Sequence, residues 1–218
     1  MPKSEKNDGA EHHFCFIIGL FFSFGEKSIQ IIPSGEEFNI FNVGRRAQYM
    51  AQAKVLVVMG SDSDFPVMEG CFKLLKKFDI PFDARVCSAH RTPELAAQIA
   101  SSAKADGYSV IIAAAGLAAH LAGVIAAHTV LPVIGVPCKG GALHGVDALY
   151  AVVQMPTGIP VATVAIDGGS NAAILAAQML ALSDEVLSGK LSEYKAGLAA
   201  SVAERDARLQ EKIANMGE

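Results

Sequence analysis

The sequence predicts an α/β domain of three layers, in which a five-stranded parallel sheet lies between helices, and a C-terminal helical extension follows it. Two observations lead to this prediction. From Lys54 onward, short apolar runs alternate with stretches of helical periodicity. Most of these runs are continuously apolar rather than alternating, which is typical of parallel strands that are buried on both faces.

The first strand is predicted at Val55 to Met59, a continuous apolar run. Gly60 to Asp64 is a polar break, and a helix is expected from Pro66 to Phe78 because proline is tolerated in a first helical turn. Residues 82–87 predict the second strand. These elements form the first strand–helix–strand unit.

The next helix is expected from Pro93 to Asp106, and it should end near Gly107, a residue typical just past a helix end. The third strand is predicted at 110–115. The loop 116–123 is built of small residues and leads into a short alanine-rich helix, before a fourth strand at 133–136.

Residues 146–154 predict a further helix. Met155 to Pro160 contains two prolines and a glycine, so we expect a shaped loop there rather than helix. The fifth strand is expected at 161–166, followed by helices at 171–182 and from Glu185 to about Asn215. Five strands alternating with helices indicate a flavodoxin-like fold.

The chain divides into three parts on this interpretation. Residues 1–52 stand outside the strand–helix alternation and are expected to be a leader or extension, with Met50 a good candidate for the natural start. The catalytic α/β domain is expected at 53–184. Residues 185–218 form a C-terminal helical segment expected to dock on another subunit.

Composition excludes several classes of function. A net charge of -4 argues against non-specific nucleic-acid binding. The apolar run at 14–24 is too short for a membrane span. The four cysteines form no CxxC pair, so neither a zinc site nor a disulfide framework is indicated, and a cytoplasmic location is expected. A nucleophilic role for Cys87 or Cys138 is an alternative to burial in the core.

Ligands of such folds bind beyond the carboxyl ends of the strands. The loops there hold nearly every polar group of chemical interest. No metal-ligand spacing, GxGxxG motif or P-loop occurs, so a metal, a dinucleotide and a nucleoside triphosphate are not indicated. The loops are 60–64, 88–91, 116–121, 138–144 and 167–171.

Two of these loops carry groups suited to a phosphorylated ligand. Ser88, His90 and Arg91 place a hydroxyl, an imidazole and a guanidinium together, of which the imidazole is the natural proton carrier and the guanidinium a phosphate ligand. Ser61 and the amides after Gly60 can donate to a phosphate. Asp64 is either a helix N-cap or a carboxylate that accepts hydrogen bonds from sugar hydroxyls.

Several motifs, in order, resemble the N5-carboxyaminoimidazole ribonucleotide mutase family of bacterial purine biosynthesis. The resemblance covers about residues 54–206 and is specific because separate motifs agree. Leu117 departs from the commoner family pattern, which has glycine, and is expected to reshape the loop over the base. The motifs are 60–64 (GSDSD), 88–93 (SAHRTP), 118–121 (AAHL), 145–149 (GVDAL) and 154–161 (QMPTGIPV).

The resemblance implies a cofactor-free, metal-free reaction on a small-molecule substrate, in which a carboxylate moves from the exocyclic N5 to ring C4. It also implies a cytoplasmic homo-octamer. His90 would be the catalytic proton carrier, with His120 as its rival. By the same analogy, the residues that bind the substrate would be Ser61, Asp64, Ser88, Arg91, Gly116, Ala118, His120 and Leu121.

Two alternatives remain open. The same fold serves enzymes that carboxylate aminoimidazole ribonucleotide directly with CO2, although the forms of Arg91 to Pro93 and of 158–161 resemble the mutase class. The second alternative is a non-enzymatic, nucleotide-binding flavodoxin-like module. It would leave His90 and Arg91 dispensable.

Overall fold

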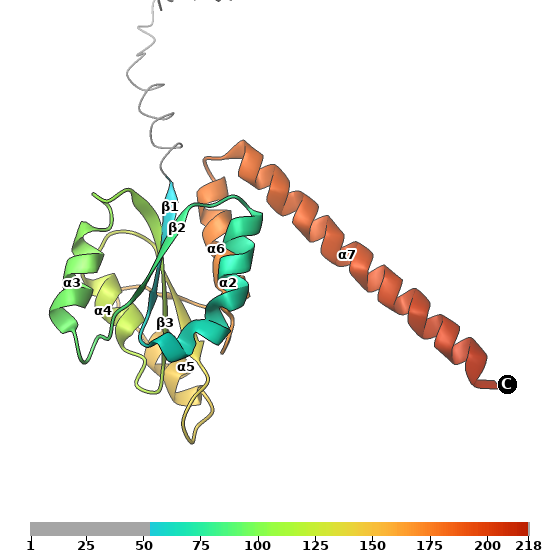
Figure 1. Cartoon of the computed structure of the whole chain (residues 1–218), viewed down its shortest axis with the longest axis horizontal. Coiled ribbons are helices and arrows are strands. Elements are labelled where there is room, and N and C mark those ends of the chain that lie inside the picture. Colours follow the sequence, from blue (N-terminus) through green and yellow to red (C-terminus); the bar gives the residue numbers. More distant parts are fainter. Residues whose placement is uncertain (1–52, 218) are drawn as a thin grey trace, which may run out of the picture. The chain divides into compact units, whose positions relative to one another are not determined.

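The computed structural model describes residues 53–217. The predictions made for residues 1–52, including the start at Met50, lie outside this range. Within it, the predicted fold class is confirmed. A five-stranded parallel sheet of order β2-β1-β3-β4-β5 is covered by helices on both faces (Figure 1).

The elements follow the predicted order. None of the described helices is long and apolar enough to span a membrane. The strands are β1 (Lys54–Met59), β2 (Phe82–Val86), β3 (Tyr108–Gly116), β4 (Val133–Cys138) and β5 (Ala162–Thr163). The helices are η1 (Asp62–Asp64), α2 (Phe65–Lys77), α3 (Pro93–Ser102), α4 (Leu121–Ala127), α5 (Val146–Val153), α6 (Gly169–Ala181), α7 (Glu185–Ala214) and η2 (Asn215–Gly217).

The predicted fifth strand at 161–166 is too long, because β5 has only two residues. It is an edge strand that pairs with β4 alone, through Ala162 and Thr163. Beyond it the chain stays attached to β4 by single hydrogen bonds, from Val164 N to Gly135 O (3.1 Å) and from Asp167 N to Pro137 O (2.9 Å). The apolar run predicts strand as far as residue 166, but regular pairing with β4 ends at Thr163.

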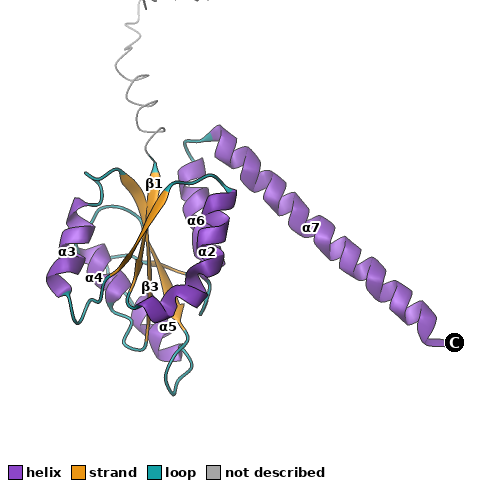
Figure 2. Ribbon diagram, viewed as in Figure 1, coloured by secondary structure: helices purple, strands orange, loops and turns teal. Residues whose placement is uncertain are grey.

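Two apolar cores lie on opposite faces of the sheet. Helices α2 and α6 cover one face, and α3, α4 and α5 cover the other (Figure 2). Alanines make close packing possible on both sides, since Ala172 and Ala176 of α6 and Ala96 and Ala100 of α3 are completely buried. Small side chains therefore bring the helices, and the loops that lead into them, close to the strand ends.

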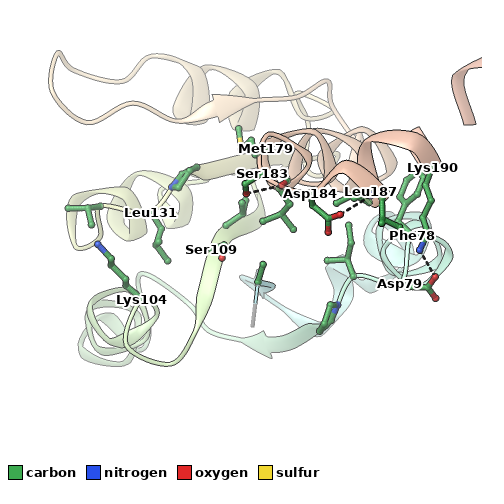
Figure 3. A pocket seen from close by; sticks show the side chains of 18 residues that line it. Phe78, Asp79, Lys104, Ser109, Leu131, Met179, Ser183, Asp184, Leu187 and Lys190 are labelled. Atoms are coloured by element: carbon green, nitrogen blue, oxygen red, sulfur yellow. Dashed lines mark hydrogen bonds and ion pairs between the residues drawn. The ribbon is translucent and has the colours of Figure 1, made fainter. Parts of the chain in front are cut away.

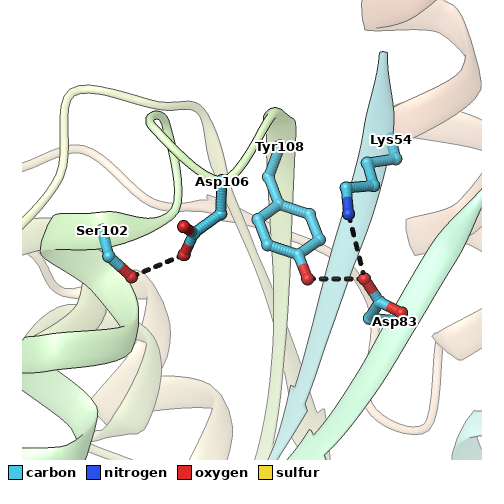
Figure 4. A network of polar contacts seen from close by, with 5 residues as sticks. All are labelled: Lys54, Asp83, Ser102, Asp106 and Tyr108. Atoms are coloured by element: carbon cyan, nitrogen blue, oxygen red, sulfur yellow. Dashed lines mark hydrogen bonds and ion pairs between the residues drawn. The ribbon is translucent and has the colours of Figure 1, made fainter. Parts of the chain in front are cut away.

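The edge strand β2 is largely exposed and contains the charged residues Asp83 and Arg85, unlike the buried central strands. Lys54 Nζ donates to Asp83 Oδ2 at 3.3 Å, and the Tyr108 hydroxyl donates to the same oxygen at 2.5 Å, which links the starts of β1, β2 and β3 (Figure 4). Burial and this hydrogen bond raise the pKa of Tyr108 to about 12. The Tyr108 hydroxyl and the Lys54 ammonium lower the pKa of Asp83.

Helix α7 is attached to the domain through its first turns. Asp184 caps it by accepting a hydrogen bond from Leu187 N at 3.0 Å. Leu187 is buried, and the ring of Tyr194 packs edge-on against Phe78 at a centroid distance of 5.5 Å. Beyond Tyr194 the apolar side chains of α7 are exposed, Leu198 by 52% and Val202 by 63%. The predicted C-terminal helix is therefore present.

A cavity of about 510 Å³ lies at the amino end of the strands (Figure 3). Phe78, Leu131, Met179 and Leu187 form apolar parts of its wall. Its charged rim includes the ion pair between Lys190 Nζ and Asp79 Oδ2 (2.7 Å). None of the site residues predicted from the sequence lines it.

The packing of α5 on β4 predicts the effect of one substitution. A Cβ added at Gly135 would overlap Val152 Cγ1 and lie 2.9 Å from Val161 Cγ1. Gly135→Ala should therefore destabilise the fold by about 1–3 kcal/mol, which urea denaturation would measure. The control is Gly197→Ala, since a Cβ on that residue of α7 has no neighbour within 4 Å. Equal effects of the two substitutions would contradict this packing.

Candidate active site

All nine site residues predicted from the sequence line one cavity of about 510 Å³ at the carboxyl ends of the strands. Four loops meet there, following β1, β2, β3 and β4. The nine residues are Ser61, Asp64, Ser88, His90, Arg91, Gly116, Ala118, His120 and Leu121.

The loop after β1 is a capped 3₁₀ turn. Ser61 N donates to Asp64 Oδ2 at 3.0 Å, and Ser63 N donates to Ser61 Oγ at 3.3 Å, which together form a capping box. Burial raises the pKa of the Asp64 carboxyl, against the lowering effect of the Ser61 amide. Asp64 thus caps this turn with one oxygen while it lines the cavity.

The loop after β2 is closed on itself by Thr92. Ser88 N donates to Thr92 Oγ1 (3.1 Å), Thr92 Oγ1 donates to Ser88 O (2.9 Å), and Thr92 N donates to the same carbonyl (2.8 Å). Arg91 N donates to Ser88 Oγ at 3.2 Å. The Ser88 hydroxyl accepts this bond and can still donate its own proton to a ligand. The loop therefore holds Ser88, His90 and Arg91 in one fixed turn.

The two histidines of the cavity form a hydrogen bond. His90 Nε2 and His120 Nδ1 are 2.9 Å apart, with ring centroids at 5.0 Å and an interplanar angle of 74°. One nitrogen must donate and the other accept, so the bond requires at least one neutral ring. The sequence makes the two residues rivals for the role of proton carrier, whereas the structure places them in one hydrogen-bonded pair.

The loop after β3 supplies one member of this pair, His120. His120 N donates to Ala118 O at 2.8 Å, and the backbone carbonyl oxygen of His120 accepts from Val124 N at 2.9 Å as α4 begins. Leu121 is only 2% exposed, so its side chain belongs mainly to the core. Leu117 has φ of 54°, a left-handed conformation that is unusual for leucine.

The loop 138–144 lies at this edge of the sheet as predicted, but the sequence did not single out any of its residues as site residues. Lys139, Gly140 and Gly141 line it. Lys139 N donates to Asp167 Oδ1 at 2.7 Å, which connects this loop to the one after β5. A usable signal was present, because Lys139 is a cation directly after a buried strand.

The two cysteines near the loops do not have the features of nucleophiles. Cys138 is 2% exposed, and burial raises the pKa of its thiol to about 12. Cys87 is also 2% exposed, and its sulfur contacts Thr92. The alternative of a thiol nucleophile is therefore disfavoured. Within residues 53–217, no three His, Cys, Asp or Glu side chains cluster as a metal site would require.

Known proteins resemble this chain over the same region. A mutase of Pyrococcus horikoshii, described as N5-carboxyaminoimidazole ribonucleotide mutase, is 51% identical over 155 residues, which are 71% of this chain and 88% of that protein. The protein of the same description from Mycobacterium tuberculosis is 52% identical over 157 residues, 72% and 90% of the two chains.

A protein of Saccharomyces cerevisiae described as phosphoribosylaminoimidazole carboxylase is 49% identical over 155 residues, but these are only 27% of its length. Among solved structures, PurE of Treponema denticola matches with a TM-score of 0.66 and 30% identity, covering 72% of this chain and 98% of that one. Residues 54–201 match the AIR carboxylase family. This match spans more than half of the sequence, so the chain belongs to the AIR carboxylase family.

Proposed function

We propose that this enzyme, an isomerase of de novo purine biosynthesis, converts N5-carboxyaminoimidazole ribonucleotide to 4-carboxy-5-aminoimidazole ribonucleotide in the cavity at the strand ends. The observation that carries the proposal is the convergence of all nine predicted residues on this cavity. The mutase relatives at about half identity support the same reaction.

The reaction needs no external reactant. The bond between N5 and the carboxylate carbon breaks, CO2 leaves, and the electron pair stays on N5, which takes up a proton. Ring C4 then attacks CO2, and the proton on C4 is removed to restore the aromatic ring. One group that gives a proton to nitrogen and takes one from carbon can serve both steps.

We assign that role to His90. Its Nε2 is hydrogen-bonded to His120 Nδ1, so His120 can hold one tautomer of the His90 ring and return it to that state after each turnover. The pair lines the same cavity as Gly116 and Ala118, the small residues beside which the imidazole base is expected to bind.

The ribose phosphate is assigned to the loops after β1 and β2. Among residues 53–217 no ion pair occupies the Arg91 guanidinium, which can therefore grip a phosphate through two N–H groups. Ser61 and Ser88 supply hydroxyl donors. Burial leaves the Asp64 carboxylate poorly solvated and raises its pKa. Hydrogen bonds donated by sugar hydroxyls would replace part of the lost solvation.

Direct carboxylation of aminoimidazole ribonucleotide with CO2 is the second candidate, because the fungal relative is described as a carboxylase. The assay supplies the purified protein with each substrate in turn, without ATP or added metal. Conversion of the N5-carboxylated ribonucleotide at the higher kcat/KM supports the mutase. Preference for aminoimidazole ribonucleotide with CO2 supports the carboxylase. If the protein converts neither substrate, the remaining candidate is a non-enzymatic nucleotide-binding module.

We further propose that residues 53–184 are the catalytic unit and that the enzyme is a cytoplasmic homo-octamer. Helix α5 presents an exposed apolar stripe, with Val146 exposed by 44%, Tyr150 by 61% and Val153 by 47%. Asp147 Oδ1, on the same helix, is buried without a hydrogen-bond partner in the described part of the chain. Another subunit packed on α5 and on the exposed half of α7 would cover the exposed apolar side chains of both helices.

The central prediction concerns His90. His90→Asn keeps a similar size but cannot shuttle a proton, so kcat should fall by about 10²–10⁴-fold while ribonucleotide binding remains. His120→Asn removes the partner ring but not the proton carrier and should lower kcat less. Steady-state kinetics and ligand titration measure both. Near-normal kcat in His90→Asn, together with loss in His120→Asn, would transfer the role to His120.

A second prediction separates binding from chemistry. The phosphate is remote from C4, so Arg91 should stabilise the ground state and the transition state equally. Arg91→Ala should mainly raise KM and change kcat little. A lower kcat with unchanged KM would contradict this assignment.

A third prediction concerns assembly. The wild-type protein should be an oligomer by light scattering at micromolar concentration, and Tyr150→Glu should shift it toward smaller species because a charge would enter the apolar contact. Gln98→Glu adds the same charge at an exposed position of α3 and serves as the control. A monomeric wild-type protein would refute the proposal.

A further inference from the structure

Leu117 stands out among the residues that line the cavity. It has φ of 54°, and its side chain is 56% exposed although it is large and apolar. A strained backbone at a ligand site persists only where the surrounding structure holds it in place. Both features point to a role of the side chain toward the ligand.

The Leu117 side chain reaches from the loop after β3 to the loop after β4. A Cβ added at Gly141 would lie 2.6 Å from Leu117 Cδ2, and one added at Gly140 would lie 4.0 Å from it. Leu117 Cδ2 therefore occupies the space that the missing side chain of Gly141 leaves free. The two loops and this leucine together form one side of the cavity.

Apart from Leu121, the rest of the lining is polar, charged or small. Leu121 is the other large aliphatic residue of the lining, and it is only 2% exposed. Within the described part of the chain, Leu117 thus provides the main exposed apolar surface of the cavity. CO2 carries no net charge and is a weak hydrogen-bond acceptor. Contact with an apolar side chain is therefore more favourable for it than contact with water or with a charged group.

We propose that Leu117 is a positioning residue that keeps CO2 beside C4 between decarboxylation and recarboxylation. The inference rests on the proposed function, in which CO2 is free inside the cavity for part of each turnover. Leu117 excludes water from one side of the base and closes the gap between the two loops. Escape of CO2 would leave aminoimidazole ribonucleotide as a by-product.

The measurement is the ratio of released aminoimidazole ribonucleotide to carboxylated product, corrected for the decomposition without enzyme. Leu117→Gly removes the side chain and suits a positive φ, and Leu117→Asn keeps a side chain that also tolerates this conformation. Both should raise the ratio by about tenfold or more, because the loss of an apolar contact in a binding pocket typically changes discrimination by at least about tenfold. Leu117→Met, which restores an apolar side chain, should return the ratio toward wild type.

Leu143→Ala is the matched control, because Leu143 is 60% exposed in the loop after β4 and does not line the cavity. It should leave the ratio unchanged. Thermal unfolding of each variant shows whether the fold is retained, and Leu117→Gly should be at least as stable as wild type.

A double-mutant cycle tests the contact itself. Gly141→Ala should push the Leu117 side chain aside and raise the ratio. In the Leu117→Gly background only the strain of alanine at φ of 59° remains, so the same substitution should raise the ratio less. If the wild-type enzyme turns over but all these variants keep its ratio, the role of Leu117 is refuted and the proposed function stands. If the wild-type enzyme does not convert the substrate, both proposals fail.

Discussion

The site depends on the register of the parallel sheet. Met59 at the end of β1 pairs with Val86 of β2 and with Ala114 of β3, and Gly116 of β3 pairs with Cys138 of β4. Strand ends fixed in this way bring four loops from distant parts of the chain to one edge. A one-residue slip in any pairing would turn side chains to the other face and separate the loops.

Unusual backbone conformations gather at this edge. Leu117, His144 and Asp167 have positive φ without being glycine, and each lies in a loop at the strand ends. Such residues cost roughly 1–2 kcal/mol each relative to ordinary conformations. The alanine-packed helices and the central strands, which carry almost no buried polar side chains, provide the stability that offsets this cost.

The sequence was sufficient to predict the fold class and nine of the residues that line the cavity, because continuous apolar strands and loop positions are local properties of the chain. It could not predict the bond between His90 and His120, since the two are 30 residues apart and meet only through the sheet. It also missed Lys139, and the positive φ of Leu117 became visible only in three dimensions. Distances between loops depend on register and on helix packing, which local patterns do not encode.

On the proposed mechanism, His90 serves both candidate reactions equally well, because each requires removal of the same proton from C4. The two reactions differ in the source of CO2, which is either the substrate itself or the solution. A mutase must retain CO2 for the time of one bond formation, whereas a carboxylase must admit it. The chemistry of the histidine pair therefore does not separate the two classes. On the role proposed for Leu117, the walls of the cavity would separate them, because Leu117 and its contact at Gly141 would favour retention of CO2 over its exchange with the solution.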